Sequence, residues 1–223
     1  MSISSSLSPA TILIATLFNS PTRSKRPRVG PSAHAILHRL LATPSAIALI
    51  EGPSGSGKST LLSGIAKLAK DKECSLACVN KNDLRPCSRV IDYLIELMLV
   101  APRPQSFNAL HQAASLLSAC GLGEPSLWLR RPKLLSDSEQ ARFTLACAIA
   151  RGGVNPDSAP FIVVIDEFLS TLDRITAQAT CAAIARLLKT RPAIRLLAAT
   201  AHTDLASFLE PLFVVRRGSG SQS

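Results

Sequence analysis

Gly52-Pro-Ser-Gly-Ser-Gly-Lys-Ser59 matches the phosphate-loop pattern GxxxxGK[ST]. In this pattern the glycines let the backbone turn tightly and direct its N–H groups at phosphate oxygens. The apolar run Ala46–Ile50 before the loop predicts a buried strand, and Thr60–Ala69 after it has the spacing of a helix with one buried face. A strand, a glycine loop and a helix in this order predict a nucleoside triphosphate site at the helix N-terminus.

Two side chains of this loop have specific chemistry. Lys58 is expected to contact the β- and γ-phosphates, and the Ser59 hydroxyl to ligate Mg²⁺. ATP and Mg²⁺ are therefore the expected ligands. The nucleotide-binding residues expected here are Gly52, Pro53, Ser54, Gly55, Ser56, Gly57, Lys58, Ser59 and Thr60.

An acidic pair follows the clearest strand of the sequence. Phe161–Ile165 is a run of five apolar residues after a proline-containing loop, which predicts a buried strand, and Asp166 and Glu167 follow at its carboxyl end. Ligands bind at this end of the strands in open α/β sheets. Asp166 is expected to hold Mg²⁺ through a water, and Glu167 to polarise the attacking water.

Strand and helix patterns alternate along the rest of the chain. Further strands are expected at Ser75–Val79 and Ile194–Thr200, and the segment from about 88 to 135 has helical spacing. The pattern predicts an α/β fold, a P-loop NTPase whose mostly parallel sheet is flanked by helices, with a small inserted helical subdomain at about 88–135. We expect residues 1–31 to be a basic N-terminal arm, 32–217 the ATPase domain and 218–223 a disordered tail.

Composition bounds the location and partners. The net charge of +10 is uneven, because no Asp or Glu precedes Glu51 and basic residues cluster between Arg23 and Arg28. A flexible cytoplasmic arm is the preferred interpretation, and a polyanion-binding tail or an organelle-targeting segment are the alternatives. No apolar run reaches the ~18–20 residues that span a bilayer. The six cysteines form no CxxC pair and are expected to be free thiols in a reducing compartment.

Three further segments resemble an ABC-type ATPase. Leu135-Ser-Asp-Ser-Glu-Gln-Ala-Arg142 and the apolar helix after it are similar to the family's signature, usually LSGGQ. Ser170-Thr-Leu-Asp173 is similar to its D-loop, and His202 to its switch histidine. The resemblance covers about residues 46–215, and the motifs follow in the family's order.

The resemblance implies a mechanism that requires two subunits. Two ATP molecules would lie between two subunits arranged head to tail, as a homodimer or as a heterodimer with another ABC ATPase. The resemblance adds Ser136 and Ser138 to the nucleotide-binding residues, because the signature of one subunit contacts the γ-phosphate held by Lys58 of the other. His202 would position the attacking water together with Glu167, so these two residues are the expected catalytic pair.

The sequence also departs from the family pattern. Asp137 and Ser138 replace the two signature glycines, and the Asp carboxylate facing a triphosphate adds like-charge repulsion. Asn80 stands where the family has a glutamine and would complete the metal ligands with Ser59 and Asp166. Phe168 replaces the usual proline after the acidic pair. A degenerate subunit that binds ATP without hydrolysing it is therefore an alternative.

What the hydrolysis drives stays open. The preferred interpretation is a soluble, non-transport ATPase module, similar to a subgroup whose members occur joined to a predicted acetyltransferase domain, so an acetyltransferase-type partner is one candidate. The ATP-binding subunit of a transporter, with a membrane permease as partner, rests on the same motifs. An ATP-dependent nucleic-acid-associated protein rests on the basic excess. A small-molecule kinase would share the phosphate loop but not the signature or His202.

Overall fold

The computed structural model describes residues 31–79, 88–98, 107–152 and 159–218. In chain order these residues form α2 (Pro31–Ala42), β1 (Ile47–Glu51), α3 (Lys58–Asp71), β2 (Ser75–Cys78), α4 (Val90–Met98), α5 (Phe107–Ala119), α6 (Pro125–Trp128), the short 3-10 helix η2 (Pro132–Leu134), α7 (Asp137–Gly152), β3 (Phe161–Ile165), α8 (Arg174–Lys189), β4 (Ile194–Thr200), α9 (Ala206–Leu209) and β5 (Phe213–Arg216).

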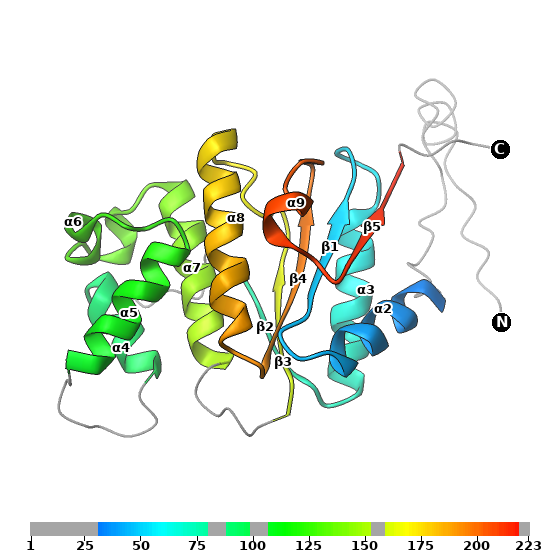
Figure 1. Cartoon of the computed structure of the whole chain (residues 1–223), viewed down its shortest axis with the longest axis horizontal. Helices are drawn as coiled ribbons and strands as arrows, with labels where there is room; N and C mark the ends of the chain where they lie inside the picture. The colour runs from blue at the N-terminus through cyan, green and yellow to red at the C-terminus, as the bar shows by residue number, and fades with distance from the viewer. Residues whose placement is uncertain (1–30, 80–87, 99–106, 153–158, 219–223) are drawn as a thin grey trace, which may run out of the picture.

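The strands form one sheet in the order β2-β3-β4-β1-β5, and each neighbouring pair is parallel (Figure 1). The register sets Ile47 of β1 opposite Leu196 of β4 and Phe161 of β3 opposite Ile194 of β4. The strand before the phosphate loop and the strand before the acidic pair are thus separated by β4 alone. The expected α/β fold with a mostly parallel sheet is confirmed.

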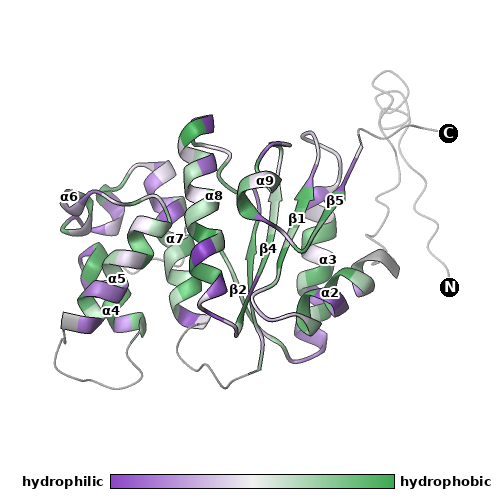
Figure 2. Cartoon of the chain, viewed as in Figure 1, coloured by the Kyte–Doolittle hydropathy of each residue, from purple (hydrophilic) through white to green (hydrophobic). Residues whose placement is uncertain are grey.

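The sheet separates two hydrophobic cores. Side chains alternate along β1, so that Ile47 and Leu49 face one core while Ala48 and Ile50 face the other. The second core also contains the apolar faces of α2 and α3, and the first contains those of α7 and α8. Figure 1 shows the resulting layers, and Figure 2 shows that the strands between them are predominantly hydrophobic. Burial on both faces explains why these strands read as continuous apolar runs.

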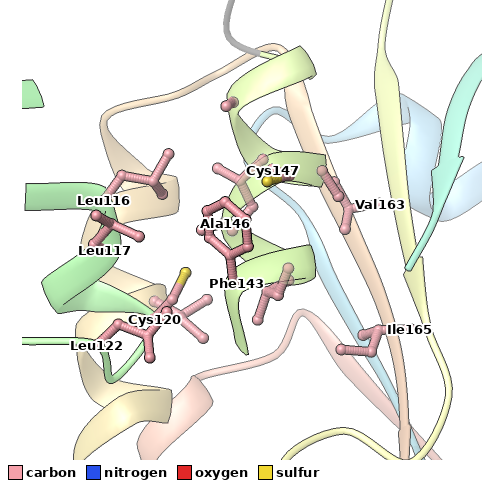
Figure 3. Close-up of a cluster of buried hydrophobic side chains, with 14 of the residues drawn as sticks. Leu116, Leu117, Cys120, Leu122, Phe143, Ala146, Cys147, Val163 and Ile165 are labelled. Atoms are coloured by element: carbon pink, nitrogen blue, oxygen red, sulfur yellow. The ribbon is translucent and has the colours of Figure 1, made fainter. Parts of the chain in front are cut away.

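Helix α7 links the helical insertion to the sheet. Its residues from Phe143 to Ala150 are buried without a break, which is typical of a helix covered on all sides. Figure 3 shows Phe143 and Cys147 of α7 between the leucines of α5 and the side chains of β3. The labelled residues of this cluster are Leu116, Leu117, Cys120, Leu122, Phe143, Ala146, Cys147, Val163 and Ile165.

Most expected elements are present, with differences at their ends. The signature helix begins at Asp137, inside the signature itself, and the helical insertion contains the short helix α6 beside the longer α4 and α5. Helix starts are hard to find by apolar spacing because their first turn is exposed and polar. The N-terminal arm lies almost wholly outside the described residues, and the proposed domain boundaries stay a prediction.

Within the described ranges, no helix is both long enough and apolar enough to cross a membrane.

The cysteines give a test of this packing. Burial raises the pKa of Cys120, Cys147 and Cys181 to about 12, whereas Cys78 is exposed at the end of β2. Because the thiolate is the reactive form, we expect Cys78 in native protein at pH 8 to be alkylated and the three buried thiols to stay unmodified until the protein unfolds. Mass spectrometry of labelled peptides reads each thiol separately. Labelling of the buried three at the rate of Cys78 would contradict the packing.

Candidate nucleotide-binding and hydrolysis site

The phosphate loop lies between the end of β1 and the start of α3. Gly57 has φ 83°, a left-handed conformation that favours glycine, and α3 begins at the next residue. Gly52 is closely covered, since a Cβ built there would lie 2.3 Å from the carbonyl oxygen of Arg217. The loop therefore requires glycine at both ends for two different reasons, one conformational and one steric.

Two polar groups inside the loop have hydrogen-bonding capacity that a bound anion could use. The Lys58 ammonium donates to the carbonyl oxygens of Gly52 at 2.6 Å and Pro53 at 2.7 Å, which leaves one of its three N–H donors for a ligand. The Ser56 hydroxyl oxygen is buried without a hydrogen-bond partner in the part of the chain that the structure describes. Buried polar atoms are usually paired, so an orphan hydroxyl in a phosphate-loop sequence fits a loop that awaits its ligand.

The end of β4 joins the other site segments. The carbonyl of Thr200 accepts the Gly52 N–H at 3.3 Å, and the carbonyl of Ala199 accepts the Phe168 N–H at 2.7 Å. The Thr200 hydroxyl in turn accepts the His202 N–H at 3.2 Å. The phosphate loop, the segment after the acidic pair and the His202 turn are thus hydrogen-bonded to two adjacent residues of one strand.

The acidic pair is exposed in a constrained turn. Asp166 and Glu167 are both exposed, and Glu167 has φ 50°, a region that non-glycine residues rarely adopt. The Glu167 N–H donates to the Asp166 carboxylate at 2.9 Å, and the Glu167 carbonyl accepts the Ser170 N–H at 3.1 Å. Phe168, with no exposed surface, anchors the turn in the core. Such conformations persist where the surroundings hold them, and they concentrate at functional sites.

The oxygen groups near this edge suit Mg²⁺ shared with phosphates. Ser59 provides a hydroxyl in the first turn of α3, and Asp166 a carboxylate after β3, and both are hard oxygen donors. Over the described ranges, no three His, Cys, Asp or Glu side chains gather as a metal cage made of protein alone would require.

The start of α7 is capped by its own side chains. The Ser136 hydroxyl accepts the Glu139 N–H at 3.3 Å, and the Glu139 carboxylate accepts the Ser136 N–H at 2.7 Å. This reciprocal pair is a capping box, and the hydrogen bond from the Ser136 backbone lowers the pKa of Glu139. Both Ser136 and Asp137 are exposed.

The same helix start adjoins the acidic pair of its own chain. Ser138 and Arg142 of α7 line a cavity of about 140 Å³ together with Asp166 and Glu167. Arg142 donates to the carbonyls of Ser138 and Gly121, so it ties α7 to the turn after α5. Desolvation of this half-buried guanidinium lowers its pKa.

A family model described as ABC transporter matches residues 40–155, just over half of the chain. This chain belongs to the ABC transporter family, as an ATPase domain. The ABC ATPase is 27% identical over 203 residues to the lipoprotein-releasing system ATP-binding protein LolD of Hyphomonas neptunium, which covers 80% of this chain and 84% of that protein. It is 33% identical over 158 residues to the molybdenum import ATP-binding protein ModC of Pseudomonas syringae pv. tomato, and the alignment covers 60% of this chain and 40% of that protein.

A solved structure has the same fold. The dimeric structure of MJ0796, a bacterial ABC transporter cassette, aligns with a TM-score of 0.56 and 20% identity, covering 78% of this chain and 82% of that one. The resemblance inferred from the motifs is therefore confirmed at the level of family and fold. Fusion to an acetyltransferase domain finds no support in these comparisons.

The sequence-predicted site residues of this ABC ATPase divide into three groups. The phosphate loop, Asp166–Glu167 and His202 are brought to one edge of the sheet. Ser136 and Ser138 lie at the start of α7, and Ser138 borders the cavity of the acidic pair. Asn80 lies outside the described residues. The individual roles of all these residues stay predictions.

Sequence reasoning missed two residues that shape the site. Glu51, at the end of β1, is 1% exposed, and its carboxylate is paired with Arg216 of β5 at 3.4 Å. An acidic residue that ends an apolar strand was the available signal. In the sequence Phe168 differs from the family's proline, and its N–H makes the hydrogen bond to the Ala199 carbonyl that a proline could not make.

Phe168 gives the sharpest test of this geometry. We expect Phe168→Ala to lower the free energy of unfolding by about 3–5 kcal/mol, because it empties a fully buried site and loosens the turn of Glu167. Phe208→Ala is the matched control, since Phe208 is 37% exposed and should cost less than about half as much. Urea unfolding followed by circular dichroism measures both. Equal losses for the two variants would refute the anchoring role.

Proposed function

We propose that this ABC ATPase binds Mg·ATP in its phosphate loop and hydrolyses it to ADP and phosphate. The observation that carries the proposal is the convergence on Ala199 and Thr200, which accept hydrogen bonds from the phosphate loop, from Phe168 after the acidic pair, and from the His202 turn. Family membership supports ATP hydrolysis as the reaction. A phosphate site and a carboxylate at one sheet edge supply the two parts that the reaction needs.

Binding would use the loop and the start of α3. The Lys58 ammonium would contact the β- and γ-phosphates, and the backbone N–H groups from Gly55 to Thr60 would surround them. Ser59 and Asp166 would hold Mg²⁺, with Asn80 as the third protein oxygen. Bound there, Mg²⁺ would neutralise charge on the β- and γ-phosphates.

Hydrolysis would depend on the acidic pair. Glu167 would accept a proton from the water that attacks the γ-phosphorus, the bond from that phosphorus to the bridging oxygen would break, and ADP would leave. His202 would orient the water and contact the γ-phosphate. The constrained backbone at Glu167 supports this role, because such conformations concentrate at functional sites.

A second subunit would close the site. Ser136 and Ser138 of one subunit would face the triphosphate bound by the other, whether that is another copy or a different ABC ATPase. The related cassette of the same fold is described as dimeric, which is consistent with this arrangement.

Replacing the proposed base tests the reaction. We expect Glu167→Gln to lower ATP turnover by at least about hundredfold, the usual effect of losing a general base, while ATP binding is retained. Glu96→Gln, on the exposed face of α4, should leave turnover unchanged. Phosphate release measures turnover, and titration with a fluorescent ATP analogue measures binding. Turnover of Glu167→Gln within about threefold of the native rate would exclude Glu167 as the base.

A membrane permease is the partner that the comparisons support best. The relatives described above are named as ATP-binding proteins of lipoprotein-releasing and molybdenum import systems. The soluble, non-transport module expected from the sequence is not tested by these findings and stays a prediction, and nucleic-acid and acetyltransferase partners find no support in them. Affinity purification from detergent-solubilised membranes of the source cells should recover an integral membrane permease. If the purified ATPase carries no permease and hydrolyses ATP at its full rate without one, the non-transport module would be favoured.

A further inference from the structure

A second cavity lies at the edge of the sheet opposite to the nucleotide site. It has a volume of about 350 Å³ and is bordered by the ends of α4 and α7, by α5, and by the turn that leads from α8 into β4. Figure 1 shows this edge at the bottom of the view, where β3 and β4 begin. Ile194, which starts β4, lines the cavity, whereas Thr200, which ends the strand, belongs to the nucleotide site. The proposed function therefore leaves this cavity without a role.

The turn that leads into β4 is held in place by its backbone. The Arg191 N–H donates to the Leu188 carbonyl at 2.9 Å, and the Ile194 N–H donates to the Arg191 carbonyl at 3.0 Å. The carbonyl of Pro192 accepts the Ser45 N–H at 3.4 Å, which joins the turn to the segment before β1. A cavity wall that is fixed in this way loses little conformational freedom when a ligand binds.

Arg191 brings an unpaired charge to the lining of this cavity. Its side chain is half-buried, and desolvation lowers its pKa. Within the described ranges, the Arg191 guanidinium makes no hydrogen bond and no ion pair. Arg195 of β4 is different, because its guanidinium donates to the carbonyls of Leu40 at 3.1 Å and of Pro192. A half-buried guanidinium with unused donors lacks the anionic partner that such groups normally have.

Among the residues that the structure describes, no neighbouring carboxylate supplies that partner. Besides burial, the group that acts on the pKa of Arg191 is Cys120, and this thiol is neutral because burial raises its own pKa to about 12. The last carbonyls of α7 and α8 contribute partial negative charge at this edge, but basic side chains in the same turns, among them Arg151 and Arg186, offset it. The charge of Arg191 is thus available to an anion from solution.

The remaining walls of the cavity are mostly apolar. Met98, Ala193 and Ile194 present apolar surface, and Gln112 adds one amide, whose Nε2 donates to the Asn108 Oδ1 at 3.2 Å. The volume lies at the lower end of the range for small-molecule sites. An inorganic anion would pair with the guanidinium but leave the apolar walls uncovered, whereas an organic acid with a short apolar body would use both.

We propose that this cavity binds a small organic carboxylate. The carboxylate pairs with the Arg191 guanidinium, and the apolar body of the ligand covers Met98 and Ile194. The ion pair supplies the anion that the half-buried guanidinium lacks, and burial of the apolar body adds affinity. Binding at this edge of the sheet requires neither ATP nor a second subunit.

Isothermal titration calorimetry of nucleotide-free protein with hexanoate and with benzoate tests the site. We expect both carboxylates to bind native protein at least about tenfold more tightly than their neutral amides, hexanamide and benzamide, because only the anions can form the ion pair. Arg191→Gln should weaken carboxylate binding by at least about tenfold and leave amide binding unchanged. Arg186→Gln, the matched control, removes an exposed arginine from the last turn of α8 and should change neither.

Two further measurements separate this site from other causes of binding. Lys58→Ala removes the cation of the phosphate loop and should leave carboxylate binding unchanged, so loss of binding in that variant would place the anion in the phosphate loop and overturn the proposal. Inorganic phosphate should bind more weakly than hexanoate, and equal binding would overturn the assignment of an organic ligand.

Three results of the titrations would also overturn the site. They are the absence of carboxylate binding to native protein, equal binding of carboxylates and amides, and equal carboxylate binding by native protein and by Arg191→Gln. Melting temperatures show whether each variant is folded. If Arg191→Gln does not fold, Arg191→Lys takes its place, and it should still weaken carboxylate binding because it keeps the charge but loses the planar pair of donors.

Discussion

The carboxyl end of β4 is the constraint on which the site depends. Two successive carbonyls, of Ala199 and Thr200, accept N–H groups from Phe168 and Gly52, which belong to the segments after the two neighbouring strands. The phosphate loop and the acidic pair are thereby held in register with one strand and with each other. Since β4 lies in the middle of the sheet and is buried along its whole length, small movements of either segment would break hydrogen bonds in a dry environment.

The rest of the molecule can be understood as support for this edge. Both faces of the sheet are covered, by α2 and α3 on one side and by α7 and α8 on the other, so the strands cannot slip without exposing apolar side chains. Helix α7 is buried between the insertion and β3, and it carries the signature at its exposed start. The signature therefore stands on a helix that packs against both the insertion and the sheet.

How much of this could be predicted from sequence depends on the range of the interaction. The glycine loop, the strand Phe161–Ile165 and the acidic pair were found because their patterns are local. The order of the strands is set by packing between distant segments, so the place of β4 between β1 and β3 came only with the structure. The same holds for Phe168, because its N–H donates to the carbonyl of Ala199, a residue far downstream on another strand. The capping box is also local, since Ser136-Asp-Ser-Glu139 has the spacing that such a box requires.

That capping box changes how the departures from the family pattern should be weighed. Considered alone, Asp137 places a negative charge at the start of α7, and Ser138 adds a small polar side chain. Together with Glu139 they give α7 a stable start, because hydrogen bonds and two carboxylates satisfy its first turn within the chain. The spacing of this capping box is also present in the family's usual LSGGQ, whose Gln stands where Glu139 stands, so the hydrogen bonds between residues 136 and 139 do not set this chain apart. The difference lies in the two residues inside the box, because Asp137 and Ser138 add a carboxylate and a hydroxymethyl group where the family has glycine.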